Sequence, residues 1–562
     1  MARVHKTTDW LRAIGMLLLL LGTPHLARAA GAEDRRDGIV RIHQRYYPQS
    51  LDPQMSSGVE VATFLSTNYE GLTRLDEELD VVPASAERWE FSDDGLTITF
   101  HLRDNLTYSD GSPLTAERFA DAVRRTCDPN VLGDYQHILF DVAGCQAFAS
   151  LYTGGEEVTP VARDDRPAYE TARRNVGVAA PDARTLEIRL THPAPYFPAI
   201  AGLSVFYPAK QELIAQGGED WWQDPALQAG NGPFQVIRME PDQLAVFTAN
   251  ERYWGGRPRL DGIEFVYVPD SAVALEAYRV GDLDIASFDP GLLAPIAADP
   301  ALRQEVVRVP GASTGMLSFN LTREPFTDKR VREAFAYAFD RQTYCALLRD
   351  GGCLPALSWI PPDVPGHIDT TAYAFDPEKA REALAASSYG GPEQLPEITF
   401  AYWVEEPSEA EKVEWMAGQY RDILGVELTL QPLEGKTLVD AMSDPATYPG
   451  MALTGWVQDY PDPQNWLSVY WTCAATFAQD FGYCNPELDA LIARADREED
   501  PVERLALYEE AGRVLVDDAP GVFLSHAVFL YLVTPEVTGY ASTPVDAGWP
   551  GQTASLLTVD VS

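Results

Sequence analysis

Residues 87–104 read ERWEFSDDGLTITFHLRD, and this stretch indicates the class of the fold. Every second residue from Leu96 to Leu102 is apolar, which is the period of a half-buried strand. The turn-forming pair Asp94-Gly95 stands just before that run, so the sequence predicts a hairpin here. A second alternating run, Leu186–Leu190, predicts another strand.

Further along the chain the apolar period changes to that of a helix. Residues 328–342 read DKRVREAFAYAFDRQ, with apolar residues at i, i+3, i+4, i+7 and i+8 from Val331 to Phe339. Residues 488–495 repeat the pattern, and Pro501 after the N-cap residue Asp500 predicts the start of one more helix. We expect these stripes to be core. Strands alternating with helices over this length predict an α/β fold.

The first 29 residues have the features of a secretion signal. Three basic residues lie within residues 1–12, an apolar run follows from Ala13 to Leu21, and Ala27-Arg28-Ala29 has the form of a cleavage site. The apolar run is too short to span a membrane. We therefore expect cleavage near Ala29 and, because no cysteine follows the run, a periplasmic protein without a lipid anchor.

Length and charge restrict the possible functions. The chain has 562 residues, which is too long for one hydrophobic core and predicts two or three domains. Its formal charge of −41 makes nucleic acids and anionic membranes poor partners. The charge also suits simple solubility, so it says little more about function.

The six cysteines fall into three pairs that are close in sequence. These pairs are Cys127 with Cys145, Cys345 with Cys353, and Cys473 with Cys484. In an oxidising compartment such pairs favour disulfides. Zinc is the competing interpretation, but the spacings lack C-x-x-C and the histidines are scattered. We expect neither a metal nor a cofactor.

One catalytic pattern is present, because residues 311–315, GASTG, satisfy the G-x-S-x-G expression of a hydrolase nucleophile elbow. That elbow requires a strand before it and a helix after it. Here Pro310 precedes the motif and residues 316–321 alternate like a strand, which favours a crossover of small residues. A secreted hydrolase using Ser313 remains the alternative from another class, but we expect no enzyme.

The segment most suggestive of a binding site is residues 455–471, GWVQDYPDPQNWLSVYW. Pro461 and Pro463 restrict the backbone, and five aromatic residues surround Asp459 in the sequence. A carboxylate on a stiff loop between aromatic walls suits an ammonium group, through charge-assisted hydrogen bonds and cation–π contact. Aromatic loops are also ordinary packing, so both interpretations stay open.

The chain resembles the extracellular solute-binding proteins of ABC importers for oligopeptides, dipeptides and nickel, known as family 5. The resemblance follows the order and spacing of segments along nearly the whole mature chain. These segments are residues 51–78, the block DGLTITFHLRDNLTYSDGSPLTAERFADAVRRTCDPN at 94–130, NGPF at 231–234, NERYW at 250–254, YRVGDLDI at 278–285, residues 319–341, and WVQDYPDP at 456–463.

The resemblance implies a two-lobed periplasmic binding protein of type II. It predicts a large lobe of two subdomains and a second lobe joined by two crossover strands, near residues 308–317 and 523–529. The expected divisions are a signal peptide at 1–29, one subdomain from 30–70 with 200–310 and 527–562, another from 71–199, and the second lobe from 311–526. Lobe closure around the ligand is what the inner-membrane permease of the importer would recognise, and a monomer is expected.

On the second lobe, the resemblance assigns the capture of a peptide's α-amino group to Asp459. Trp456 matches the tryptophan three residues before that aspartate, and Gly455 lies beside it where peptide backbone is bound. Tyr460 completes the D-Y motif. These four residues are the expected ligand contacts of this lobe.

On the large lobe, Gly58 and Val59 match a segment that pairs with ligand backbone like an added strand. Ser57 stands where other members have an acidic residue, and Tyr135, six residues beyond Pro129, matches a tyrosine that faces the ligand.

The far end of the site departs from the oligopeptide pattern. Gly435, Met442 and Leu453 stand where other members have a tryptophan and two arginines. The chain is thus expected to bind di- to oligopeptides, while an oligosaccharide or metal chelate remains an alternative ligand for the same fold.

Overall fold

The computed structural model describes residues 38–48, 50–56, 58–133, 135–152, 166–404 and 407–561. The expected signal peptide lies outside these residues. Within them, no helix combines the length and the apolar character needed to cross a membrane.

The main sheet has eleven strands in the order β15-β14-β16-β12-β17-β11-β1-β10-β9-β8, with β13 paired to β17. Its pairs are both parallel, as for β1 with β10, and antiparallel, as for β12 with β17. The strands are β1 (Ile39–Gln44), β8 (Phe234–Glu240), β9 (Leu244–Ala249), β10 (Gly262–Tyr267), β11 (Ile285–Ser287), β12 (Val306–Phe319), β13 (Cys353–Pro355), β14 (Ile398–Trp403), β15 (Leu428–Leu433), β16 (Met451–Val457) and β17 (Gly521–Val533).

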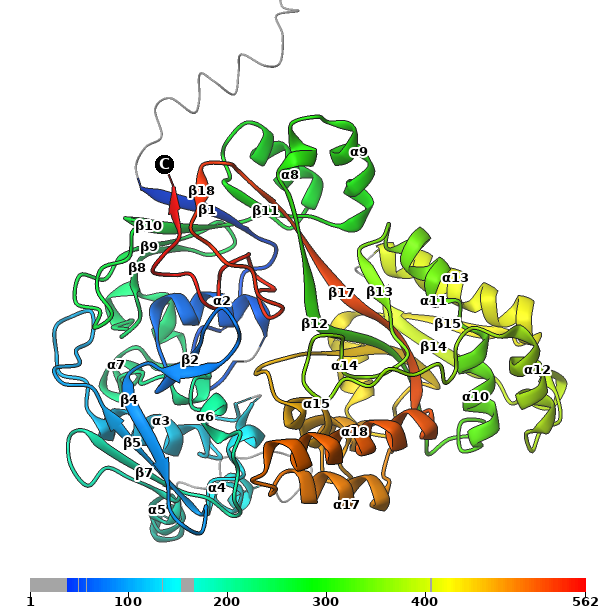
Figure 1. Ribbon diagram of the computed structural model, residues 1–562, viewed down its shortest axis with the longest axis horizontal. Helices are drawn as coiled ribbons and strands as arrows, with labels where there is room; N and C mark the ends of the chain where they lie inside the picture. Colours follow the sequence, from blue (N-terminus) through cyan, green and yellow to red (C-terminus); the bar gives the residue numbers. More distant parts are fainter. Residues whose placement is uncertain are drawn as a thin grey trace, which may run out of the picture.

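Two of these strands, β12 and β17, connect the two lobes (Figure 1). We call the residues before β12 and after β17 the first lobe, and the residues between these strands the second lobe. The two strands pair from Val306 with Leu532 to Ser318 with Gly521, and the register shifts between Pro310 and Thr314. The expected crossovers are therefore present as long antiparallel strands.

The first lobe also contains a second sheet of order β4-β5-β7-β6. Strands β4 (Ala86–Phe91) and β5 (Thr97–Leu102) form the predicted hairpin, and β7 (Thr185–Arg189) confirms the other predicted strand. The remaining strands of this lobe are β2 (Thr73–Leu75), β3 (Val81–Pro83), β6 (Val178–Ala179), β18 (Val537–Thr538) and β19 (Asp560–Val561). Its helices are α2 (Val59–Asn68), α3 (Ala116–Thr126), α4 (Cys145–Ala149), α5 (Arg166–Asn175), α6 (Phe197–Ile200), α7 (Gln211–Gly217), α8 (Ser271–Arg279) and α9 (Leu293–Ala298).

The second lobe is rich in helices, as the sequence predicts. Its helices are α10 (Lys329–Ala338), α11 (Arg341–Thr343), α12 (Pro377–Ala386), α13 (Pro407–Leu424), α14 (Gly435–Met442), α15 (Pro463–Trp471), α16 (Thr476–Asp480), α17 (Pro486–Ala495) and α18 (Pro501–Asp518). Asp500 caps α18 by accepting hydrogen bonds from the backbone of Val502 and Glu503. The apolar stripe of α17 is buried, which confirms it as core.

All three predicted cysteine pairs form disulfides, and no described cysteine is free. The Cys127–Cys145 bridge ties the end of α3 to the start of α4 in the first lobe. The other two bridges lie in the second lobe. The sequence proximity within each pair was thus a sound guide to the pairing.

Candidate functional site

A cavity of about 730 Å³ lies between the lobes. The first lobe supplies α2 and the hairpin of β2 and β3, the second lobe supplies β16 and the loop after it, and the crossover strand β12 lies between them. A segment near the C-terminus, residues 545–557, forms a further part of the wall. This volume is within the range of small-ligand sites.

Asp459 lies in the cavity wall, and only one oxygen of its carboxylate accepts hydrogen bonds from described residues. The Tyr135 hydroxyl of the first lobe and the Asn465 side-chain amide, at 2.9 Å, both donate to Oδ2. No described residue donates a hydrogen bond to Oδ1. Since an ionised carboxylate offers about four acceptor sites, Oδ1 can still receive hydrogen bonds from a ligand.

Asn465 holds this arrangement in place, although sequence reasoning did not single it out. It is fully buried on α15, and its Oδ1 accepts hydrogen bonds from the Asp459 backbone at 3.0 Å and from Trp456 Nε1 at 3.1 Å. Asp462 caps α15 and Pro463 occupies its first turn. Those two residues were the available signal, because they place Asn465 in the first helical turn beside the aspartate loop.

Asp459 and Tyr135 both have shifted pKa values. Burial raises the pKa of Asp459 above its ordinary value, while the hydrogen bonds from Tyr135 and Asn465 oppose that rise. Burial and the neighbouring carboxylate also raise the pKa of Tyr135. A positive group beside Oδ1 would favour the ionised carboxylate and offset part of the cost of burial.

Only part of the predicted aromatic cluster lines the cavity. Trp456 and Tyr460 are in its wall, whereas Trp466, Tyr470 and Trp471 are buried in the core of the second lobe. Tyr460 is 1% exposed and packs within the core of the first lobe, so it also bridges the lobes. The packing interpretation is therefore confirmed for three of the five aromatic residues, while binding of an ammonium group by the segment stays a prediction.

Sequence reasoning missed further aromatic rings in the wall, among them Phe477 and His137. Phe477 stacks on Tyr470 at 5.0 Å between ring centroids and lies edge-on to Trp456 at 5.1 Å. Neither residue carried a motif that could have pointed to the site.

Gly58 lines the cavity immediately before α2, and Val59 is the first residue of that helix. Ser57 lies outside the described residues. The pairing of this segment with ligand backbone stays a prediction. Tyr135 lines the same cavity.

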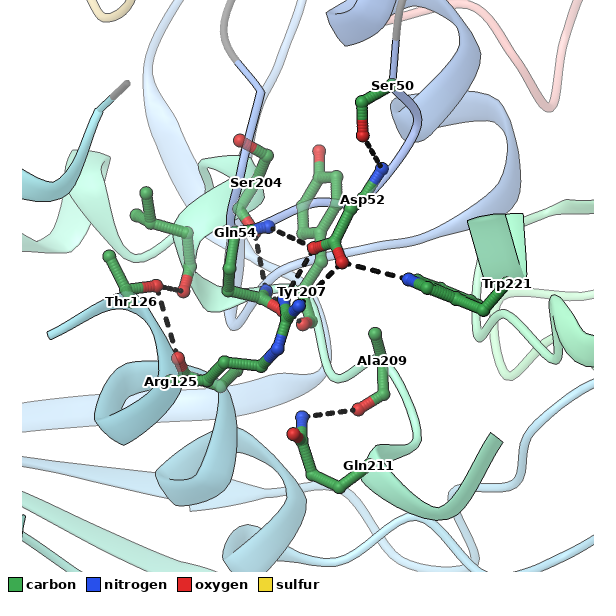
Figure 2. A network of polar contacts seen from close by, with 12 residues as sticks. Ser50, Asp52, Gln54, Arg125, Thr126, Ser204, Tyr207, Ala209, Gln211 and Trp221 are labelled. Carbon is green, nitrogen blue, oxygen red and sulfur yellow. Dashed lines mark hydrogen bonds and ion pairs between the residues drawn. The ribbon is translucent and has the colours of Figure 1, made fainter. Parts of the chain in front are cut away.

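A buried polar network holds the chain that leads to Gly58 (Figure 2). Asp52 accepts hydrogen bonds from both terminal nitrogens of Arg125, one at 2.6 Å, and from Trp221 Nε1 at 2.8 Å. Gln54 Nε2 donates to the Tyr207 carbonyl at 2.9 Å. Because these groups come from different segments of the first lobe, the network fixes the start of the cavity wall.

The residues at the far end of the predicted site do not reach the cavity. Gly435 and Met442 are the two ends of α14, and Leu453 pairs with Leu317 inside the main sheet. None of the three is in the cavity wall. Among the described residues, the one lysine or arginine in that wall is Arg74, on β2.

Ser313 does not have the setting of a hydrolase nucleophile. It lies inside β12 and pairs with Val457, so no helix follows it. His526 Nδ1 bonds to Oγ1 of the neighbouring residue Thr314 at 2.8 Å, and burial lowers the pKa of His526 to about 3. The described residues also contain no group of three or more side chains suited to hold a metal ion.

Comparison with known proteins places these features in a family. The family model of the bacterial extracellular solute-binding proteins, family 5, middle region, matches residues 80–478. The probable deoxycholate-binding periplasmic protein YgiS of Escherichia coli K12 is 29% identical over 511 residues, which cover 89% of this chain and 90% of that protein. The periplasmic oligopeptide-binding protein OppA of Salmonella typhimurium is 28% identical, with 89% of each chain covered.

Solved structures share the fold. The murein tripeptide binding protein MppA of Escherichia coli superposes with a TM-score of 0.77 at 25% identity, covering 93% of this chain and 98% of that one. The two-lobed, type II binding-protein architecture expected from the sequence is therefore confirmed.

Proposed function

The chain belongs to the bacterial extracellular solute-binding proteins of family 5, and from this premise we propose that it captures peptides in the cavity between its lobes. It delivers them to the inner-membrane permease of an ABC importer and carries out no chemistry on them. The protein acts in the periplasm after cleavage near Ala29, and it acts as a monomer.

The observation that carries this proposal is the open Oδ1 of Asp459. Two donors fix the carboxylate through Oδ2, and the cavity leaves the other oxygen for a ligand. The α-ammonium group of a peptide supplies both the hydrogen bonds and the positive charge that a buried carboxylate needs. Trp456, held by Asn465, presents an aromatic face beside the same site.

Closure of the lobes is the signal to the permease. Tyr135 and Asp459 come from different lobes and meet at the site, so the same contact senses ligand and brings the lobes together. Backbone at Gly58 and Gly455 pairs with the peptide backbone, which allows capture without regard to side chains. We propose the boundaries expected from the sequence, with 30–70, 71–199 and 200–310 plus 527–562 in the first lobe and 311–526 in the second, so that each division between the lobes falls within a crossover strand, β12 or β17.

A steroid carboxylate is the second candidate, because YgiS is named for deoxycholate binding and much of the cavity wall is apolar. The Asp459 carboxylate argues against an anionic ligand at its end of the cavity, since like charges repel strongly where water is excluded. A sugar would leave the buried carboxylate without a positive partner. The amine-bearing ligand fits best.

The proposal is tested by mass spectrometry of co-purified ligand, followed by thermal-shift screening with di- to pentapeptides and with deoxycholate. Asp459→Asn should weaken binding of a free-amine peptide by about 1.5–3 kcal/mol, the range for a hydrogen bond to a charged group. Asp93→Asn, at an exposed carboxylate of the first lobe outside the cavity wall, is the control and should change nothing.

Calorimetry gives the deciding comparison. Wild-type protein that binds a peptide and its N-acetylated form with equal affinity would refute capture of the amine. A melting temperature raised by deoxycholate and by no peptide would replace the peptide with the steroid.

A further inference from the structure

His137 lies two residues after Tyr135, on a short 3-10 helix (Gln136–Leu139), and lines the cavity. Its ring packs edge-on against Tyr135, with 5.1 Å between centroids. It also packs edge-on against Phe477 of the second lobe, at 6.2 Å. The imidazole is thus held between the two lobes at the end of the cavity where Asp459 lies.

The Nε2 atom of His137 is buried and has no hydrogen-bond partner in the described part of the chain. The other five described histidines each hydrogen-bond through a ring nitrogen. These are His43, His101, His192, His367 and His526. Leaving a buried polar atom unpaired costs about 1–3 kcal/mol, so a structure that keeps one in a ligand cavity favours a partner on the ligand.

We propose that His137 donates a hydrogen bond from Nε2 to the first carbonyl oxygen of the bound peptide, and so selects ligands that carry an acceptor next to the amine. This inference rests on the proposed function and adds a residue to it. The ligand class becomes narrower, since an amine without a neighbouring carbonyl would leave His137 unsatisfied.

The protonation state of the ring agrees with a neutral donor. Burial lowers the pKa of His137, so the imidazole is uncharged at neutral pH. A neutral imidazole carries one N–H, and it does not repel the ammonium held by Asp459 as an imidazolium would.

The position of the ring selects the ligand atom. His137 packs against the tyrosine that touches the Asp459 carboxylate, so the ligand group beside it is the one adjacent to the amine. In a peptide that group is the first carbonyl, which accepts hydrogen bonds and cannot donate them.

The test uses calorimetry on the full mature chain with trialanine, trileucine and their analogues in which sulfur replaces the first carbonyl oxygen. His137→Phe keeps an aromatic ring against Tyr135 and Phe477 and removes both nitrogens. Loss of one neutral hydrogen bond should weaken binding of the unmodified peptide, called the oxygen peptide, by about 2- to 12-fold. His137→Gln, whose side-chain amide can donate from a similar distance, should recover part of that loss.

The thioamide analogue distinguishes hydrogen bonding from packing. Wild type should prefer the oxygen peptide over the sulfur peptide, and His137→Phe should show no preference. His101→Phe, on the inner strand β5 of the four-stranded sheet and outside the cavity wall, is the histidine control and should behave as wild type.

Two failures have different meanings. If wild type binds peptides but His137→Phe binds both analogues as wild type does, the His137 inference is wrong and the proposed function stands. If wild type binds no peptide, both are wrong. In ¹⁵N-histidine-labelled protein, peptide addition should shift the His137 Nε2 resonance, and an unshifted resonance in the bound protein would also overturn the inference.

Discussion

Asp496→Asn should stabilise the protein above pH 6 and leave it unchanged near pH 4. Asp496 caps α17, and its Oδ1 accepts hydrogen bonds from the hydroxyl groups of Tyr508, at 2.5 Å, and Ser468, at 2.7 Å. Because both donors go to Oδ1, the amide oxygen of asparagine can keep both bonds. The substitution therefore removes a charge and little else.

The magnitude comes from the environment of the carboxylate. Burial raises the pKa of Asp496 from 3.8 to about 6, and Asp141 of the first lobe adds to the rise while His192 opposes it. This difference corresponds to about 3 kcal/mol of cost for the ionised form in the folded state. The side chain is half-buried, so solvent screening reduces the expected effect to about 1–2 kcal/mol.

The sign follows from linkage. The folded state raises this pKa, so the unfolded chain ionises first and the cost is absent below about pH 4. It grows as pH rises through the window from 3.8 to about 6 and is complete above that window. The neutral asparagine never incurs it.

Urea unfolding of both proteins at about pH 4 and pH 7.5 measures the difference. The variant should gain about 1–2 kcal/mol at the higher pH and nothing at the lower one. Asp93→Asn, at an exposed carboxylate of the first lobe, should show no such pH-dependent gain. An equal difference at both pH values, or a less stable variant at pH 7.5, would refute the assignment of the raised pKa to Asp496.

Three further outcomes are expected. Replacing Cys127 and Cys145 together by alanine should lower the free energy of unfolding by about 3 kcal/mol, because the bridge closes a loop between residues 18 positions apart. A loss of less than about 1 kcal/mol in urea unfolding would contradict this expectation. Gly455→Ala would place a Cβ 2.6 Å from a backbone oxygen of β12, so it should lower the melting temperature and abolish binding. Gly512→Ala is the control, because its Cβ would meet only a side-chain carbon of Ile368 at 3.6 Å, and it should stabilise α18 by about 1 kcal/mol. Arg74→Met should weaken binding of a peptide with a free C-terminal carboxylate by about two- to fivefold relative to binding of its C-terminal amide. If calorimetry finds the ratio of these two affinities unchanged, Arg74 does not contact the ligand's carboxylate.

Most of the fold was accessible from local patterns. The alternation from Leu96 to Leu102 and the helical stripe after Val331 each depend on which face of one element is buried, and such periods are written directly in the sequence. The crossovers were harder. The proline and glycine residues at 310–315 suggested a flexible link, yet β12 continues through them, with its register shifted against β17. The backbone there remains paired because Ala312 donates to the Pro544 carbonyl at 2.8 Å, a partner more than 200 residues away.

The site shows the same division between local and distant information. Asp459 could be singled out because its neighbours Pro461 and Pro463 stiffen one short loop. Which of its oxygens is occupied, however, depends on partners outside that loop, because Asn465 on α15 and Tyr135 of the other lobe, 324 positions away, both donate to Oδ2. A carboxylate held through Oδ2 alone keeps Oδ1 for the ligand. Had both oxygens been paired within the loop, the same sequence motif would form a closed structural contact with no capacity to bind an amine. The proposed capture of an amine therefore depends on Asn465 and Tyr135 both donating to Oδ2, because that arrangement leaves Oδ1 as the remaining acceptor.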